Sequence, residues 1–451
     1  LAETLALDPL DPWARWLTDE GFSGDSQIRL DLALDLSQAG FLGEALDVLK
    51  DAQAEPLSGT APLIHYYRGW ILGLSGKSGA KEFAAGARAN VDYCFPARLM
   101  EQSILQAAIN STPQDANAHA TLGHWLYDRR RHQEAVTHWQ AAVKVDPQGA
   151  IAWRCLGIAY FNVMRKPAKA RAAYQKALAA APRDARLVFE SDQLAKRLGD
   201  SPVKRLKNLL KSPGLLENRD DLALELCTLY NQTGQPAKAL AILTSRNFQP
   251  WEGGEGGPLG QYVRAHLLLG RAAGGEEAVA HFQAALSAPE NLGEARHLLA
   301  NQSDIHLLLG DALQASRQRA EARKHWALAA NARGDFQAMS VRAYSEMTFY
   351  SATALERLGK KVAAKSLLTD LLAHARQLAK AEAKIDYFAT SLPTMLLFDD
   401  DLQKTQRLTA RFLEAQARLG LGQHKKAKVL LKEVLTENPN HAPASDLIQS
   451  I

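Results

Sequence analysis

The most constraining feature of the sequence is a pattern of residues that recurs 34 positions further along the chain. Leu122 and Gly123 recur as Leu156 and Gly157, and the small, aromatic and proline residues that follow them recur as well. Apolar residues fall at helical spacing in each copy, and proline ends a helix because it lacks an N–H group. Each copy therefore predicts two antiparallel helices, and their repetition predicts a chain that grows in one dimension. The copies are Leu122, Gly123, Ala135, Trp139, Ala142 and Pro147, and Leu156, Gly157, Ala170, Tyr174, Ala177 and Pro182.

The second copy resembles the tetratricopeptide repeat, whose signature combines aromatic residues, a Leu-Gly pair, alanines and a closing proline. Weaker copies occur on both sides of it, and the alternation typical of strands is absent, so we expect no strands. The resemblance implies an all-α fold, a right-handed superhelical solenoid of antiparallel helix pairs with some degenerate repeats. The matching residues are Trp153, Leu156, Gly157, Tyr160, Ala170, Tyr174, Ala177 and Pro182.

The strength of this signature divides the chain into four stretches, which we expect to form one continuous solenoid. Loops are expected to be short except at 246–260 and 390–401. The four stretches are degenerate helical repeats at 1–113, two regular repeats at 114–184, degenerate repeats carrying the glycine-rich loop at 185–290, and further helical repeats at 291–451.

The chain begins within a repeat. Thr4–Pro9 aligns with Ala142–Pro147, the end of a second helix, and the helix that should precede it is missing. We therefore expect this chain to be the C-terminal part of a longer protein, with any signal peptide or catalytic domain upstream of it.

Charge and composition argue against several functions. A net charge of +4 over 451 residues is too dilute to predict a nucleic-acid partner, and no apolar run reaches the roughly 18 residues of a membrane span. The spacings of His119 with His124 and of His132 with His138 do not suit a shared metal, and no HExxH motif occurs. We expect neither a metal nor a cofactor.

Three cysteines are far apart in the sequence. This spacing fits neither a disulfide framework nor a zinc site and suits a reducing compartment. We therefore expect buried thiols on helix faces and a cytoplasmic location for Cys94, Cys155 and Cys227.

The loop at 246–260 is the strongest candidate for chemistry. Glu252 and Glu255 are three residues apart among glycines, with Arg246 and Trp251 nearby. An aromatic ring with carboxylates is suited to a sugar ring, and paired carboxylates act as acid and base in glycoside cleavage. The alternative is structural: Trp251 packs against the solenoid, and the carboxylates cap the helix that begins near Pro258.

A second resemblance supports a role for this loop. Several segments between about residues 93 and 330 are similar to a bacterial family in which a domain of unknown function, resembling the galactose-mutarotase β-sandwich, precedes a tetratricopeptide array. That family is associated with carbohydrate metabolism, and the resemblance implies a sugar-like site upstream and a WEGGEG motif containing Trp251, Glu252 and Glu255. The similar segments are Tyr93–Arg98, Leu122–Asp128, Trp153–Gly157, Arg219–Leu222, Phe248–Gly256 and Asn291–Glu294.

The inner face of the regular repeats is the other candidate site. Tetratricopeptide grooves hold extended peptides or helices, and those that bind chaperone tails use a lysine and asparagine clamp. Here Ala120 and His124 stand at the clamp positions, so that partner is disfavoured. A different peptide, or the upstream domain of the same protein, is expected. The groove positions are Asn117, Ala120, His124 and Tyr127, then Ile151, Arg154, Ile158 and Phe161.

Two functions follow. The first is a non-catalytic scaffold that docks its own N-terminal domain or a protein partner. The alternative is the helical half of a carbohydrate-active enzyme, a glycoside hydrolase in its full-length form, to which Glu252 and Glu255 contribute catalytic groups and Arg246 and Trp251 bind the sugar.

Overall fold

The computed structural model describes residues 1–18, 24–251, 254–337, 340–384 and 397–451. Within these ranges nearly all regular structure is helical, which confirms the predicted all-α solenoid of helix pairs. No helix in the described ranges is long and apolar enough to cross a membrane.

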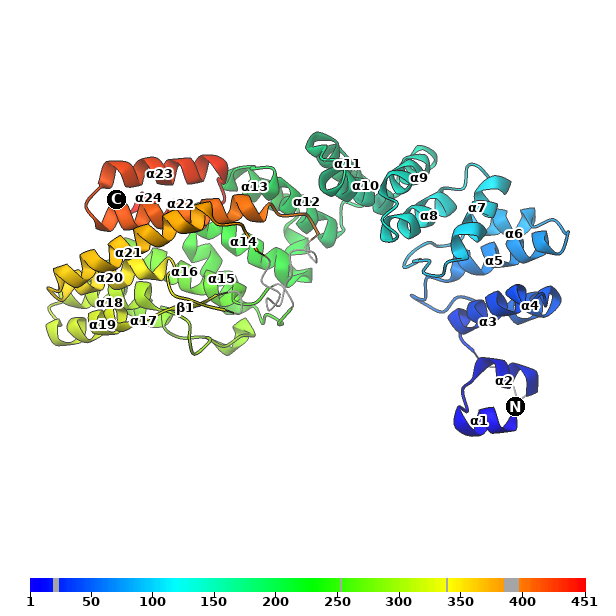
Figure 1. The fold of residues 1–451 in the computed structure, drawn as a ribbon, viewed down its shortest axis with the longest axis horizontal. Helices are drawn as coiled ribbons and strands as arrows, with labels where there is room; N and C mark the ends of the chain where they lie inside the picture. Colours follow the sequence, from blue (N-terminus) through cyan, green and yellow to red (C-terminus); the bar gives the residue numbers. More distant parts are fainter. Residues whose placement is uncertain (19–23, 252–253, 338–339, 385–396) are drawn as a thin grey trace. The chain divides into compact units, whose positions relative to one another are not determined.

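Contacts group the chain into two compact units, Leu1–Pro182 (unit 1) and Arg183–Ile451 (unit 2). Each unit consists of successive antiparallel helices (Figure 1). The finer division of the sequence into four stretches, and their continuity as one solenoid, stay predictions.

The described residues of unit 1 form eleven helices, of which α8 to α11 make up the two regular repeats. Its helices are α1 (Ala2–Leu7), α2 (Pro12–Thr18), α3 (Ser26–Gln38), α4 (Leu42–Leu49), α5 (Ala61–Leu74), α6 (Ala80–Gly86), α7 (Glu101–Ser111), α8 (Ala116–Asp128), α9 (His132–Val145), α10 (Ala150–Asn162) and α11 (Pro167–Ala180).

The signature residues of the regular repeats explain how each pair packs. A Cβ added to Gly123 would lie 2.4 Å from Nε1 of Trp139, and one added to Gly157 would lie 2.5 Å from Cδ2 of Tyr174. Both aromatic side chains are buried. Glycine is required on the first helix because the ring from the second helix fills the space that a side chain would take.

Unit 2 repeats the same packing and adds short 3₁₀ turns and one hairpin. Its elements are α12 (Ala185–Arg197), α13 (Pro202–Leu209), η1 (Pro213–Asn218), α14 (Asp220–Gln232), α15 (Pro236–Ser245), α16 (Gly257–Ala272), α17 (Gly275–Ala285), η2 (Glu290–Leu292), α18 (Ser303–Ala315), α19 (Arg319–Asn331), β1 (Asp335–Gln337), β2 (Ser340–Arg342), α20 (Met347–Arg357), α21 (Lys361–Lys380), α22 (Leu402–Gly420), α23 (His424–Glu437) and α24 (Ala442–Gln449).

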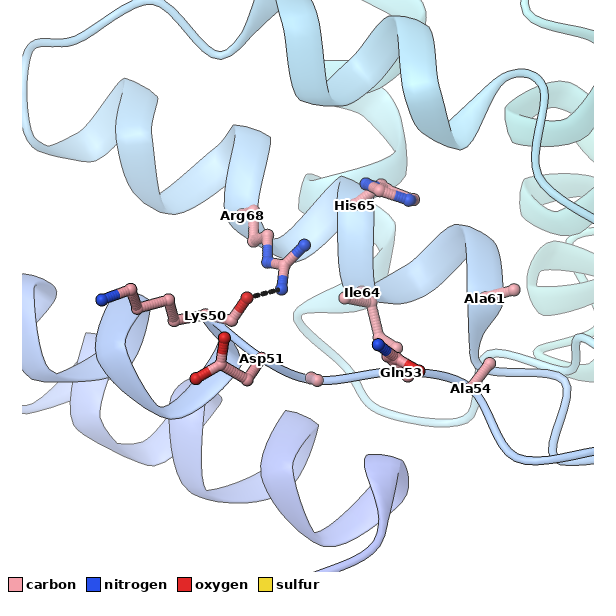
Figure 2. Close-up of a pocket in the computed structure, with 9 residues that line it drawn as sticks. Lys50, Asp51, Gln53, Ala54, Ala61, Ile64, His65 and Arg68 are labelled. Atoms are coloured by element: carbon pink, nitrogen blue, oxygen red, sulfur yellow. Dashed lines mark hydrogen bonds between the residues drawn. The ribbon is translucent and has the colours of Figure 1, made fainter.

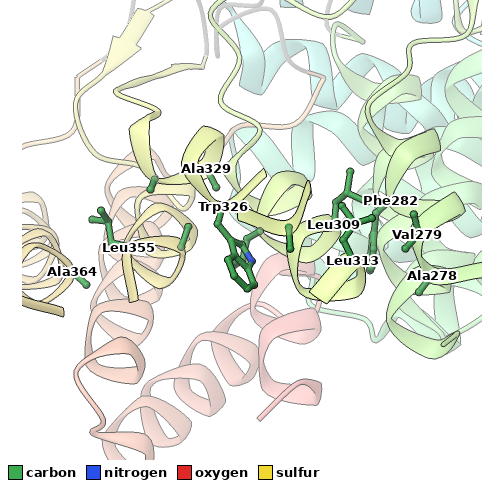
Figure 3. Packing of buried hydrophobic residues seen from close by; sticks show 13 residues of the cluster. Ala278, Val279, Phe282, Leu309, Leu313, Trp326, Ala329, Leu355 and Ala364 are labelled. Carbon is green, nitrogen blue, oxygen red and sulfur yellow. The ribbon is translucent and has the colours of Figure 1, made fainter. Parts of the chain in front are cut away.

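The core of unit 2 continues from one helix pair to the next. Phe282 of α17 packs against Gly270, and Trp326 of α19 packs against Gly310. The two aromatic side chains, together with Leu355 of α20, belong to a single buried cluster (Figure 3). Each pair thus buries its apolar face against its neighbour, as repeat proteins do.

The expectation that no strands would form is wrong for one short segment. β1 and β2 pair antiparallel, with Phe336 opposite Val341. Asn301 holds the start of this hairpin through hydrogen bonds from its backbone N to Asp335 Oδ1 (3.1 Å) and from its Nδ2 to Gly334 O (2.8 Å). A two-stranded ribbon is marginal alone, so these tertiary contacts, which the local pattern does not encode, stabilise it.

Two further expectations need correction. Long loops also occur at 87–100 and 286–302, in addition to 246–260, while most of 390–401 lies outside the described residues. Cys155 and Cys227 lie on α10 and α14 as expected, but Cys94 lies in the loop 87–100. All three thiols are free and buried.

Candidate functional site

The predicted groove residues of unit 1 lie on α8 and α10. The Nδ1 atom of His124 on α8 lies 3.7 Å from the Sγ atom of Cys155 on α10. Burial, together with the nearby positive charge of Arg154, lowers the pKa of His124 to about 4. His124 is therefore neutral at pH 7, and the cationic group on this surface is Arg154.

Half-buried apolar and aromatic side chains complete this surface. The ring of Tyr127 lies 5.3 Å from that of Trp139 and 4.6 Å from that of His132. Further along α10, Ile158 and Phe161 are half-buried. We call this set the α8–α10 face: His124, Tyr127, Arg154, Ile158 and Phe161.

Asn117, the remaining predicted groove residue, has a structural role. Its Nδ2 atom donates to the backbone oxygen of Ala89 at 2.8 Å, and to those of Gly86 and Ala87 at 3.3 Å. These carbonyls are at the C-terminal end of α6 and just after it, where helix carbonyls lack partners within the helix. Asn117 therefore fixes this turn instead of facing an open groove.

In unit 2 the corresponding first helices of the pairs contact the C-terminal end of the chain. Arg264 on α16 binds Asp446 on α24 with two hydrogen bonds of 2.8 Å. Gln232 at the end of α14 donates from Nε2 to the backbone oxygen of Pro439 at 3.2 Å. We call residues 439–446 the C-terminal segment. The sequence carries no signal for this contact, because the partners are about 200 positions apart.

A buried ionic cluster anchors the same segment. Arg205, whose side chain is fully buried, binds Asp192 and Glu225, and its Nη1 atom donates to Asn440 Oδ1 at 2.8 Å. Burial alone opposes a charge on Glu225, but the positive charges of Lys196 and Arg205 lower its pKa to about 2. Glu225 is therefore charged near neutral pH, whereas burial raises the pKa of Asp192 above its ordinary value.

The glycine-rich loop is held by two segments that are distant in sequence. Asp220 accepts a hydrogen bond from Arg246 Nε at 2.6 Å and another from the backbone N of Gln249 at 2.8 Å. Asn291 donates from Nδ2 to the backbone oxygens of Leu243 and Arg246, both at 2.8 Å. Three of the segments behind the second resemblance thus meet in space, and the guanidinium of Arg246 takes part in an internal ion pair.

The loop's carboxylates have different positions. The helix cap that the structural alternative gave to Glu252 and Glu255 is supplied by Glu294, which accepts from the backbone N of Gly256 (2.6 Å) and of Leu259 (2.7 Å) at the start of α16. Glu255 is exposed, and Trp251 is half-buried against Gly254. Glu252 lies outside the described residues.

A groove of about 440 Å³ lies between the end of α4 and the start of α5 (Figure 2). Two of its basic groups have internal partners. Arg68 donates to the backbone oxygens of Leu49 and Lys50, and His65 Nδ1 lies 2.8 Å from Glu82 Oε2. Lys50 also lines the groove, together with the carboxylate of Asp51.

Paired histidines are a feature that sequence reasoning missed. The Nδ1 atoms of the two rings lie 2.9 Å apart in one pair and 3.0 Å apart in the others, within hydrogen-bond distance. Each pair joins the two helices of one repeat, and two of the pairs share a separation of 19 residues, which is the signal that a comparison of the repeats would have found. The pairs are His119 with His138, His266 with His281, and His306 with His325.

Comparison with known families identifies the repeats. One model, described as TPR repeat, matches residues 123–163, and a second, described as tetratricopeptide repeat, matches residues 409–441. The chain therefore contains tetratricopeptide repeats in both units, and such repeats define a protein-interaction scaffold. The further resemblance to the bacterial family with a WEGGEG motif stays a prediction.

Solved structures with similar helix arrangements share little sequence with this chain. YrrB, described as a TPR protein with an unusual peptide-binding site, is 19% identical over 40% of this chain and 90% of its own, with a TM-score of 0.33. MamA from Desulfovibrio magneticus RS-1 is 20% identical over 44% of this chain and 98% of its own (TM-score 0.26). PilF of Pseudomonas aeruginosa is 17% identical over 60% of this chain and 96% of its own (TM-score 0.28).

Proposed function

We propose that this chain is an interaction scaffold whose α8–α10 face binds a peptide or protein segment. The observation that carries the proposal is the composition of this face in unit 1: Tyr127, Ile158 and Phe161 are half-buried on the same two helices that carry the cationic Arg154 and the neutral His124. Aromatic residues and arginine supply much of the binding energy in protein interfaces. In unit 2, by contrast, α14 and α16 bind the chain's own C-terminal segment.

The partner we favour is the upstream domain of the same protein, with a separate cytoplasmic bacterial protein as the other candidate. An intramolecular partner needs little affinity, because the linked segment is present at a high effective concentration.

The test is binding of the separately expressed upstream segment, measured by calorimetry, to three forms of this chain. Ile158→Lys places a charge on the α8–α10 face, and Thr137→Lys places the same charge on the exposed side of α9. We expect Ile158→Lys to weaken binding at least about ten-fold, equivalent to about 1.4 kcal/mol, and Thr137→Lys to leave it unchanged.

If the upstream segment does not bind, the same three proteins serve as bait in cell extract. A protein retained by the wild type and by Thr137→Lys but lost by Ile158→Lys supports an external partner. If no ligand distinguishes the two variants, the proposal is wrong.

The second candidate is a sugar site on the glycine-rich loop. Its support is an exposed Glu255 close in sequence to a half-buried Trp251, on a loop that Asp220 and Asn291 hold in place. Glu252 would supply the second carboxylate and Arg246 a further polar group. Paired carboxylates of this kind serve as acid and base in glycoside hydrolysis.

This candidate is tested with the full-length protein and a panel of glycosides. Glu252→Gln and Glu255→Gln are expected to abolish turnover while the melting temperature stays the same. Turnover that is indifferent to both substitutions, or absent from the wild type, would remove the loop from the catalytic site.

A further inference from the structure

A second groove in unit 1 lies away from the α8–α10 face. It has a volume of about 550 Å³ and is formed by the end of α9, one side of α10, and α11. Ile158 and Phe161 do not line it, whereas Trp153, Leu156 and Tyr160, on a different side of α10, do. We call it the lysine groove.

The sequence of α11 explains why the groove exists. Lys169 and Lys176 are seven residues apart, so they lie on one side of the helix, two turns from each other. Ala172 and Ala173 stand between them, and these small side chains leave the space between the lysines unfilled. The groove therefore has an apolar floor between two cationic ends.

Two aromatic rings form its other wall. Trp153 is fixed by a hydrogen bond from Nε1 to the backbone oxygen of Pro147 (3.0 Å), and Tyr160 OH accepts from Gln140 Nε2 (2.9 Å). The Nζ atom of Lys176 lies 4.1 Å from the centre of the Trp153 ring. These anchors hold the rings in place without a ligand, so binding would order few side chains.

The charge of the lysine groove is unbalanced. Lys144, Lys169 and Lys176 line it, no carboxylate does, and within the described part of the chain none of the three forms an ion pair. The groove beside α5 differs, because Asp51 lines it beside Lys50, and Arg68 and His65 there already have partners. An acidic ligand would thus gain in the lysine groove what it would not gain there.

We propose that the lysine groove binds an acidic peptide segment, with an aliphatic side chain packed between Trp153 and Tyr160 and carboxylates paired with Lys169 and Lys176. Apolar contact with the floor provides the area, and the lysines select an anionic sequence. This site is separate from the α8–α10 face, so the chain has two binding surfaces in unit 1.

The test uses a short fluorescein-labelled peptide in which leucines are flanked by aspartates, followed by fluorescence anisotropy. Lys169→Glu/Lys176→Glu is expected to weaken binding at least ten-fold and to bind a matching peptide in which lysines replace the aspartates. Lys361→Glu/Lys365→Glu, which changes two exposed lysines of α21, is the control with the same net charge and is expected to bind like the wild type.

Three results would overturn the proposal: no binding of the acidic peptide by the wild type, equal weakening in both double variants, or tighter binding of a single-stranded oligonucleotide at the same groove. Trp153→Leu changes the apolar wall of the groove without changing its charge. This variant is expected to bind the peptide more weakly while its circular dichroism spectrum, and hence its helix content, stays unchanged. Ile158→Lys is expected to leave this probe unaffected, so failure here is distinct from failure of the α8–α10 face.

Discussion

The two units use the same helix pair but differ in what their first helices contact. In unit 1 the α8–α10 face contains half-buried aromatic and apolar side chains together with Arg154. In unit 2 the first helices α14 and α16 bind the C-terminal segment through Gln232 and Arg264. The difference shows that a repeat fixes the backbone scaffold, while a few polar side chains decide which segment its surface binds.

The packing of the regular repeats in unit 1 and the contact of the C-terminal segment in unit 2 also depend on different forces. Packing in the regular repeats of unit 1 depends on rings seated on glycines, such as Trp139 on Gly123. In unit 2 the C-terminal segment is held by a buried cation, Arg205, which binds two carboxylates and Asn440. Removing one member of a buried ionic group is more costly than its net contribution suggests, because the remaining charges lose their partner.

The largest effect is therefore expected from Arg205→Ala. It leaves Asp192 and Glu225 buried without their arginine, a loss of about 3–5 kcal/mol in the free energy of unfolding of unit 2. Hydrogen exchange is expected to speed up in α13, α14 and α24 and to stay unchanged in α8 to α11. Lys204→Ala, at an exposed neighbour, is the control. A loss shared equally by both units would contradict the comparison.

A smaller effect is expected from releasing the C-terminal segment at its far end. Asp446→Ala removes two charge-assisted hydrogen bonds to Arg264 and is expected to cost about 1.5–3 kcal/mol. Exchange is expected to rise in α24 and α16, whereas Gln449→Ala, exposed on the same helix, leaves both unchanged. If α24 stayed protected from exchange in Asp446→Ala, Arg205 and the apolar contacts of α24 alone would be enough to hold the C-terminal segment.

The sequence predicted the helix pairs because their determinants are local and periodic. Gly157 with Tyr174, for example, is a pair that the repeat signature brings together at a constant spacing. It did not predict the contact of Arg205 with Asn440, because nothing in either segment marks the other as its partner. The β1–β2 hairpin was missed for a similar reason, since its support comes from Asn301.

The candidate sites show the same limit. His124 lies on α8, and Arg154, Ile158 and Phe161 lie on α10, but helical spacing gave no indication that Asn117 would bind the turn after α6. The lysine groove was also not predicted, because it depends on small residues of α11 facing a ring on another helix.

Lowering the pH is expected to destabilise the helix pair that contains His266. Burial and the neighbouring His281 lower the pKa of His266 to about 4, below its ordinary value of 6.5. Because the unfolded chain then binds a proton more readily, stability is lost as the pH falls from about 6.5 towards 4. The loss is about 1 kcal/mol for this histidine between pH 6.5 and 5.5.

The measurement is a series of urea unfolding curves from pH 7.5 to 5, with His266→Gln as the comparison. The variant is expected to show a shallower decline than the wild type. Glu225, with a pKa of about 2, keeps its charge throughout this range, so its ion pair with Arg205 is expected to persist. A decline as steep in His266→Gln as in the wild type would contradict the assignment to His266.

The smallest effect is expected at the start of α16, where the cap comes from a distant residue. In unit 1 the cap of α8 is local, since Asp115 accepts from the backbone N of Ala118 at 2.8 Å. In unit 2 Glu294 performs this role from 38 positions beyond Gly256 and joins the glycine-rich loop to the segment after η2.

Glu294→Ala is expected to cost about 0.5–2 kcal/mol, and Glu294→Gln less, because the amide oxygen still accepts a hydrogen bond. Melting temperatures of the two variants measure this order. An equal loss in both would mean that the charge of Glu294 near the N-terminus of α16, and not its hydrogen bonds, fixes the loop.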